Sequence, residues 1–306
     1  KGIRRYGADR NEGSSMAAYQ DLFWWSKDEL KLHARDYPGD AGALPVLCLP
    51  GLTRNARDYE VLAGRLSGAR RVIAIDFRGR GESAYAKDPM SYGPLTYAQD
   101  VIALLDAAGI DRFVSIGTSL GGIVTMLLAA LVPGRIAGAL LNDVGPEIDP
   151  AGAARIAGYV GKSSVWPTWV HAAHALAESN ADVYPAWRIE DWLAMAKRLY
   201  RLNSAGRIVL DYDLKIAEPF HVPPAEAGPD MWRALAALGN APVLIVRGGN
   251  SDILSATIAD RMVAALPDAE LLTVAGIGHA PTLDEPGVDE AIVRLLARAE
   301  REPAGV

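Results

Sequence analysis

The chain has 306 residues, half of them hydrophobic and 22% charged, which is typical of a globular protein and excludes a disordered or fibrous one. The formal net charge of -6 argues against nucleic acid or an anionic membrane as partner, so we expect a small-molecule substrate. The only cysteine, Cys48, excludes an internal disulfide. The basic N-terminal stretch lacks the apolar segment of a secretory signal, so we expect a cytoplasmic protein.

The first half of the chain alternates short apolar runs with helical patterns. Two β-prone runs, residues 21–26 and 30–37, come first and favour an antiparallel pair at a sheet edge. Apolar runs then alternate with helical patterns, which indicates a mostly parallel sheet with helices on both faces. The expected strands are 45–50, 71–76, 112–117 and 136–143, and the expected helices are 56–66, 96–109 and 120–134.

This alternation stops at about Pro150 and resumes near Ala241. We therefore predict an α/β core of residues 1–150 and 240–306, with a helical cap of residues 151–239 inserted in it. After the cap, the expected strands are 242–248 and 269–276, and the expected helices are 256–266 and 289–299.

The predicted cap is rich in tryptophan and has one clear amphipathic stretch. Five of the seven tryptophans lie in it, and we expect most of them to pack the cap on the core and one or two to line a cavity. The residues expected on one helical face are Ile189, Trp192, Leu193, Ala196, Leu199 and Tyr200.

The stretch "GTSLGG" places Ser119 between Gly117 and Gly121, where a predicted strand turns into a predicted helix. This is the pattern of a nucleophile elbow, a turn so tight that side chains two residues either side of the serine would clash. The serine would also begin a helix, whose free N–H groups favour developing negative charge. Ser119 is therefore the predicted nucleophile.

A serine hydroxyl needs a base, and the base needs a carboxylate to orient it. Among the five histidines, only His279 follows a late core strand, and its loop is placed to reach the serine. Two aspartates that follow core strands can supply the acid, Asp252 and Asp143. We prefer Asp252 and keep Asp143 as the alternative.

An oxyanion hole needs two backbone N–H donors. We expect one from Leu120, the residue after the serine, and the other from Leu52 in the loop that follows strand 45–50. In the same loop, Arg54 is a candidate for contact with a substrate carboxylate, although arginines are usually solvated surface residues.

These residues, together with "DFRGRGES", "RGGNSD" and "GIGHAPTLDEP", resemble the α/β-hydrolase fold superfamily from about Asp21 onward. The resemblance implies an eight-stranded, mostly parallel sheet, a cap between the sixth and seventh strands, and a triad of Ser119, Asp252 and His279. Many members of the superfamily carry a histidine at the position of Pro50. The donor at Leu52 is a backbone group, so catalysis does not depend on the side chain at position 50.

The expected function is a serine hydrolase that acts on a small or medium carbonyl compound with an apolar body, such as a carboxylic ester, thioester or enol-lactone. A C–C bond hydrolase and a cofactor-free perhydrolase with the same triad are alternatives. A non-catalytic ligand receptor on the same fold is an alternative of another class. We expect no metal and no cofactor, because no metal-binding spacing and no helix-opening dinucleotide motif occurs.

Overall fold

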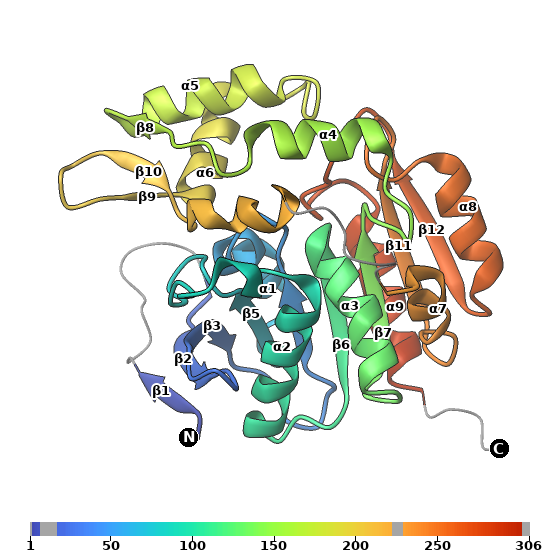
Figure 1. The fold of residues 1–306 in the computed structure, drawn as a ribbon. Coiled ribbons are helices and arrows are strands. Elements are labelled where there is room, and N and C mark those ends of the chain that lie inside the picture. The colour runs from blue at the N-terminus through green and yellow to red at the C-terminus, as the bar shows by residue number, and fades with distance from the viewer. Residues whose placement is uncertain (1, 7–16, 222–228, 302–306) are drawn as a thin grey trace.

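A computed structural model describes residues 2–6, 17–221 and 229–301, which form a large sheet flanked by helices, with a layer of further elements above it (Figure 1). The sheet has nine strands in the order β1-β2-β3-β5-β4-β6-β7-β11-β12. These strands are β1 (Arg4–Tyr6), β2 (Gln20–Trp25), β3 (Lys31–Tyr37), β4 (Val46–Leu49), β5 (Val72–Asp76), β6 (Phe113–Thr118), β7 (Ile136–Asn142), β11 (Val243–Gly248) and β12 (Ala269–Val274).

The sheet is parallel from β5 to β12 and antiparallel at its β1-β2-β3 edge. This confirms the predicted α/β-hydrolase fold and the antiparallel pair at one edge. The count differs from the expected eight strands, because β1 pairs with β2 and adds a ninth strand. From the sequence, no element is predicted at the three residues of β1.

The central strands are buried on both faces, as their continuous apolar sequences predict. In β4, Leu47 and Leu49 join one hydrophobic cluster, while Val46 and Cys48 join the cluster on the opposite face. This alternation follows from the period of two in a strand. Helices must therefore cover both faces of the sheet.

Two groups of helices cover the two faces. Residues of α2, α3, α7 and α8 belong to the first cluster, and residues of α1 and α9 belong to the second. The helical elements of the core are η1 (Ala56–Tyr59), α1 (Glu60–Leu66), η2 (Pro89–Ser91), α2 (Pro94–Ala108), α3 (Leu120–Leu131), α7 (Met231–Ala236), α8 (Ala256–Ala265) and α9 (Val288–Ala299).

Residues 150–221, between β7 and β11 in the chain, form the upper layer in Figure 1, where they lie over one end of the sheet. This layer contains a three-stranded antiparallel sheet, β8-β10-β9, that the helical pattern did not predict. Its elements are α4 (Pro150–Tyr159), β8 (Val165–Trp166), α5 (Trp169–Asn180), α6 (Ile189–Leu199), β9 (Tyr200–Leu202), β10 (Ile208–Leu210) and η3 (Leu214–His221). Helix α7 falls within the predicted cap boundaries but packs on α3 of the core.

The upper layer has a small hydrophobic core of its own, which includes residues of α5, α6 and β10. On α6, Trp192 and Ala196 are buried as expected, whereas Ile189 is exposed. Trp187 and Trp192 pack against each other and against Tyr184, and Trp166 stacks on Tyr200. These tryptophans therefore serve packing within the upper layer.

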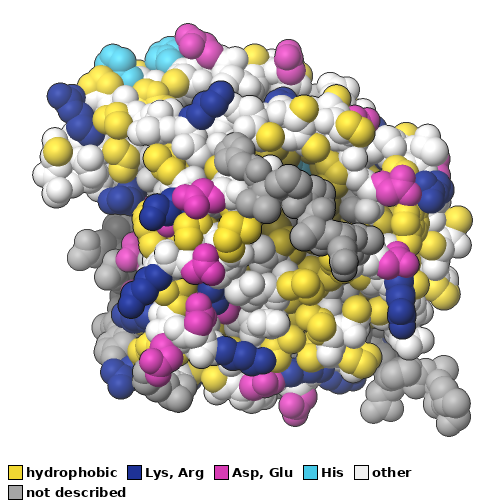
Figure 2. All heavy atoms as spheres, viewed as in Figure 1, with side chains coloured by type: hydrophobic (Ala, Val, Ile, Leu, Met, Phe, Trp, Pro, Cys, Tyr) yellow, Lys and Arg dark blue, Asp and Glu magenta, His cyan; other side chains and the backbone are white. Residues whose placement is uncertain are grey.

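On the face shown in Figure 2, acidic and basic side chains are interspersed, and hydrophobic side chains gather around the middle, where the upper layer meets the core. Within the described residues, no helix is both long enough and apolar enough to cross a membrane.

Candidate active site

Ser119 lies at the turn between β6 and α3, where it caps the helix with φ +52° and ψ -114°. A Cβ atom on Gly117 would lie 2.4 Å from the carbonyl oxygen of Gly121, and one on Gly121 would lie 1.9 Å from the carbonyl oxygen of Leu49. Only glycine fits at both positions. This steric limit is the one that the sequence pattern suggested for the two glycines around Ser119. The turn is held by a hydrogen bond of 2.9 Å from the Ser119 N–H to the Asn142 carbonyl.

The structure brings His279 to this serine, as the sequence predicted. His279 lies in the loop between β12 and α9, and its Nε2 atom is 2.9 Å from Ser119 Oγ. The histidine side chain is largely buried, with 10% of its surface exposed. A neutral imidazole in this position accepts a proton from the serine hydroxyl if Nδ1 carries the other proton.

The carboxylate that contacts His279 belongs to Asp143, the alternative, and not to the preferred Asp252. Asp143 follows β7, and its Oδ2 atom is 2.8 Å from His279 Nδ1. The Asp252 carboxylate is instead bound by Arg155 of α4, whose Nη2 donates to Oδ1 at 2.8 Å and whose Nε donates to Oδ2. Hydrogen bonding to Arg155 lowers the pKa of the Asp252 carboxyl group. The expected Ser119–His279–Asp252 arrangement is therefore corrected to one that contains Asp143.

Three donors hold the Asp143 carboxylate, which is fully buried. Gly248 N–H donates to Oδ1 at 2.8 Å, and Ser251 Oγ donates to Oδ2 at 2.7 Å, beside the contact with His279. A buried carboxylate is costly unless hydrogen bonds satisfy its oxygens, and these three donors do so. The role of Ser251 was missed by sequence reasoning, although the residue lies in the quoted segment "RGGNSD".

The loop after β4, which contains Leu52, runs alongside Ser119. A Cβ atom on Gly51 would be only 3.8 Å from Ser119 Cβ, so this backbone lies against the serine. Leu120 begins α3, and the first N–H groups of a helix have no partner within the helix. The predicted donor Leu120 thus follows the serine directly in the chain, and the loop that carries the other predicted donor, Leu52, lies next to the serine through Gly51.

Arg80 contacts the loop that carries Leu52. It was not predicted from the sequence as a site residue. Its guanidinium is fully buried, and its Nε atom donates to the Leu52 carbonyl at 2.9 Å. Its Nη1 atom donates to the Arg78 carbonyl and to the Tyr97 hydroxyl. The "DFRGRGES" segment therefore fixes the position of Leu52, a role that sequence patterning alone does not reveal.

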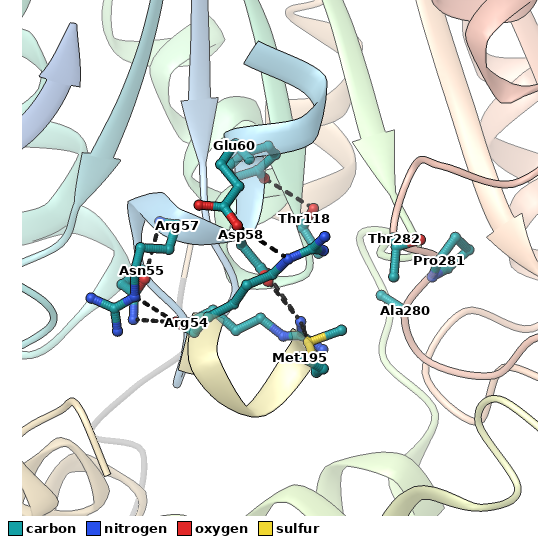
Figure 3. Close-up of polar contacts among 12 residues, drawn as sticks. Arg54, Asn55, Arg57, Asp58, Glu60, Thr118, Met195, Ala280, Pro281 and Thr282 are labelled. Atoms are coloured by element: carbon teal, nitrogen blue, oxygen red, sulfur yellow. Dashed lines mark hydrogen bonds and ion pairs between the residues drawn. The ribbon is translucent and has the colours of Figure 1, made fainter. Parts of the chain in front are cut away.

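Arg54, the candidate for binding a substrate carboxylate, already has a carboxylate partner. Its Nη1 atom donates to both oxygens of Asp58, at 3.0 and 3.1 Å, and lies 3.4 Å from Met195 Sδ of α6 (Figure 3). A small pocket is lined by Arg54, Asp58, Tyr59, Thr118, Arg198, Ala280, Pro281, Thr282 and Leu283, and this lining contains neither Ser119 nor His279. Asp58 thus offsets the charge of Arg54 in this pocket.

Over the described residues, no group of three or more histidine, cysteine, aspartate or glutamate side chains is arranged to hold a metal ion. Cys48 is buried in β4, and burial raises the pKa of its thiol, so it is poorly suited to act as a nucleophile.

Comparison with known proteins agrees with the fold. The model of the alpha/beta hydrolase family matches residues 46–289. A crystal structure of an alpha/beta hydrolase from Novosphingobium aromaticivorans has 58% sequence identity and a TM-score of 0.88, and the match covers 93% of this chain and all of that one.

Two curated relatives are similar over most of their length. A 3-hydroxybutyrate-oligomer hydrolase from Cupriavidus necator is 33% identical over 79% of this chain and 84% of its own. Esterase YbfF from Escherichia coli is 28% identical over 88% of this chain and 98% of its own. The family model covers well over half of the chain, so the protein belongs to the alpha/beta hydrolase family and is a hydrolase.

Proposed function

We propose that the protein is a carboxylic-ester hydrolase in which Ser119 is the nucleophile, His279 the general base and Asp143 the acid that orients the base. The observation that carries this proposal is the continuous chain of contacts from Ser119 Oγ through both ring nitrogens of His279 to Asp143. Nucleophilic catalysis by serine requires this sequence of groups.

The two halves of the reaction follow from these positions. Ser119 Oγ attacks the ester carbonyl carbon while His279 Nε2 takes the serine proton, and the N–H groups of Leu52 and Leu120 bind the resulting oxyanion. Collapse of this intermediate breaks the ester C–O bond, and the alcohol leaves with the proton from His279. Water then attacks the acyl-enzyme, again with His279 as base, which releases the acid and restores Ser119.

Asp143 keeps the imidazole in the tautomer that has its proton on Nδ1 and stabilises the imidazolium that forms during the reaction. Its complete burial and its bonds to Gly248 and Ser251 keep the carboxylate aimed at Nδ1. We further propose that the upper layer, residues 150–221, acts as a cap that excludes water from the acyl-enzyme.

For the substrate, we propose short acyl esters, including short hydroxyacyl esters. The similarity to a 3-hydroxybutyrate-oligomer hydrolase, which extends over most of both chains, supports a short hydroxyacyl group.

A substrate panel tests the proposal: p-nitrophenyl acetate, butyrate and palmitate, and linear 3-hydroxybutyrate dimer and trimer. We expect kcat/KM to be highest for the short substrates, and Ser119→Ala to lower turnover by about 10⁶ because the nucleophile is lost. Circular dichroism of the variant controls for its folding. A variant that keeps more than a few per cent of the activity would exclude Ser119 as nucleophile, and a preference for palmitate would exclude the proposed substrate class.

A further inference from the structure

The loop that carries His279 is held on both sides by the turn between α5 and α6 in the upper layer. Gly278 N–H donates to the Val183 carbonyl at 2.8 Å, and the Tyr184 hydroxyl donates to the Ala280 carbonyl. Gly278 and Ala280, which flank His279 in the chain, are thus hydrogen-bonded to Val183 and Tyr184, two consecutive residues of the upper layer.

The fit between these two segments is close. A Cβ atom on Gly278 would lie 3.0 Å from Val183 Cα, so the two backbones approach more closely than a larger residue would allow. From the core, the Asn142 amide donates to the Pro281 carbonyl at 2.8 Å. The His279 loop therefore has bonds to both the core and the upper layer, and the upper layer supplies the bonds to the backbone of the two residues next to the histidine.

The Tyr184 side chain is rigidly placed. It is 3% exposed, its ring stacks on Trp187 with centroids 3.9 Å apart, and it meets Trp192 edge-on at 5.8 Å. Such an aromatic cluster leaves the ring little freedom, so the packing against Trp187 and Trp192 sets the position of the hydroxyl. Through its hydrogen bond, the hydroxyl thus fixes the Ala280 carbonyl relative to the upper layer.

Tyr184 also lies close to the loop on the oxyanion side. Arg54 Nη1 contacts Met195 of α6, and Trp192, one turn away on the same helix, packs edge-on against Tyr184. In Figure 3, Arg54 and Met195 lie together, and Ala280, Pro281 and Thr282 come from a separate loop across from them. Tyr184 thus lies near the loops that carry the proposed base and the proposed Leu52 donor.

We propose that Tyr184 is a positioning residue, through which the inserted segment holds His279 in register with Ser119 and Asp143. This inference rests on the proposed function. The reacting groups must keep a narrow geometry, and a misplacement of about 1 Å can cost about 10²-fold in rate. The upper layer therefore helps to assemble the catalytic geometry, in addition to covering it.

Tyr184→Phe tests the inference, because it keeps the stacked ring and removes only the hydroxyl. With p-nitrophenyl butyrate, we expect kcat to fall by about 10- to 100-fold while KM changes by less than about threefold. The rate of inactivation by a fluorophosphonate, which reports the reactivity of Ser119 without any need for turnover, should fall by a similar factor.

Tyr92→Phe is the matched control. The Tyr92 hydroxyl is also buried and also joins the core to the inserted segment, since it donates to Asp213 Oδ2 at 2.7 Å, but it does not touch the His279 loop. We expect Tyr92→Phe to lower the melting temperature but to leave kcat within about twofold of wild type.

Gly278→Ala is a second test, since its methyl group would press on Val183, and it should lower kcat in the same way.

The proposal is wrong if Tyr184→Phe keeps the wild-type kcat and inactivation rate, or if Tyr92→Phe loses as much kcat as Tyr184→Phe does. Either result would leave the hydrolase proposal intact as long as the wild type hydrolyses the ester, whereas an inactive wild type would contradict the proposed function itself.

Discussion

Among the histidines whose side chains the structure describes, two have an aspartate on Nδ1, and they differ in what lies on Nε2. At His279 the Nδ1 partner is Asp143 and the Nε2 partner is the hydroxyl of Ser119. At His33, on β3, the Nδ1 atom is 2.6 Å from Asp76 and the Nε2 atom is 3.1 Å from a second carboxylate, that of Asp21.

The second carboxylate changes what the ring can do. Burial works to lower the pKa of His33, but the hydrogen bonds to Asp21 and Asp76 outweigh it and raise the pKa to about 9. Such a ring stays protonated at neutral pH and has no free lone pair with which to accept a proton. A hydroxyl on Nε2, as at His279, lets the neutral imidazole act as a base. The same pair of residue types thus supports structure at one place and, in our proposal, catalysis at the other.

Replacing each histidine by glutamine should separate these two roles, and this is the largest effect we expect. His279→Gln should lower kcat by about 10⁶ with little loss of stability, because the base is lost. His33→Gln should keep kcat within about tenfold of wild type but lower the free energy of unfolding by about 3 kcal/mol, since two carboxylates lose their buried cation. Ester hydrolysis and urea unfolding of both variants measure this. Comparable activity losses in the two would refute the distinction.

A smaller effect concerns the dependence of stability on pH. Because the pKa of His33 is about 9 in the folded protein and about 6.5 in a free chain, its contribution is fully present below pH 6.5 and is lost as the pH rises through 9. The shift corresponds to about 3 kcal/mol. We expect the difference in unfolding free energy between wild type and His33→Gln to shrink by about this amount between pH 6 and pH 10. A difference that does not change with pH would show that His33 is not held protonated.

The fold was predictable in the core, because the strands there are continuous apolar runs separated by helical patterns. Short elements were not: β8 and β10 have only two or three residues each, and Ile208 pairs with Trp166 far away in the sequence. A pairing of this kind depends on how the intervening helices fold, which local patterning does not report.

The position of Ser119 was predictable from the spacing of its two glycines, and that of His279 from its place after a late strand. The identity of the acid was not predictable. Asp143 follows β7 and Asp252 follows β11, and because these strands are parallel neighbours, both aspartates lie at the same edge of the sheet. The deciding factors are the direction of the Asp143 side chain, set by a backbone with φ +57°, and the presence of Arg155 beside Asp252. Neither factor is visible in the sequence.

The central claim is that Asp143 orients the catalytic histidine, and a comparison of kcat/KM for Asp143→Asn and Asp252→Asn tests it most directly. Asp143→Asn should lower kcat/KM for p-nitrophenyl butyrate by about 10⁴, because the amide favours the wrong imidazole tautomer. Asp252→Asn should change it by less than about threefold, since only an exposed ion pair with Arg155 is lost. The reverse ranking, with the larger loss in Asp252→Asn, would contradict the account.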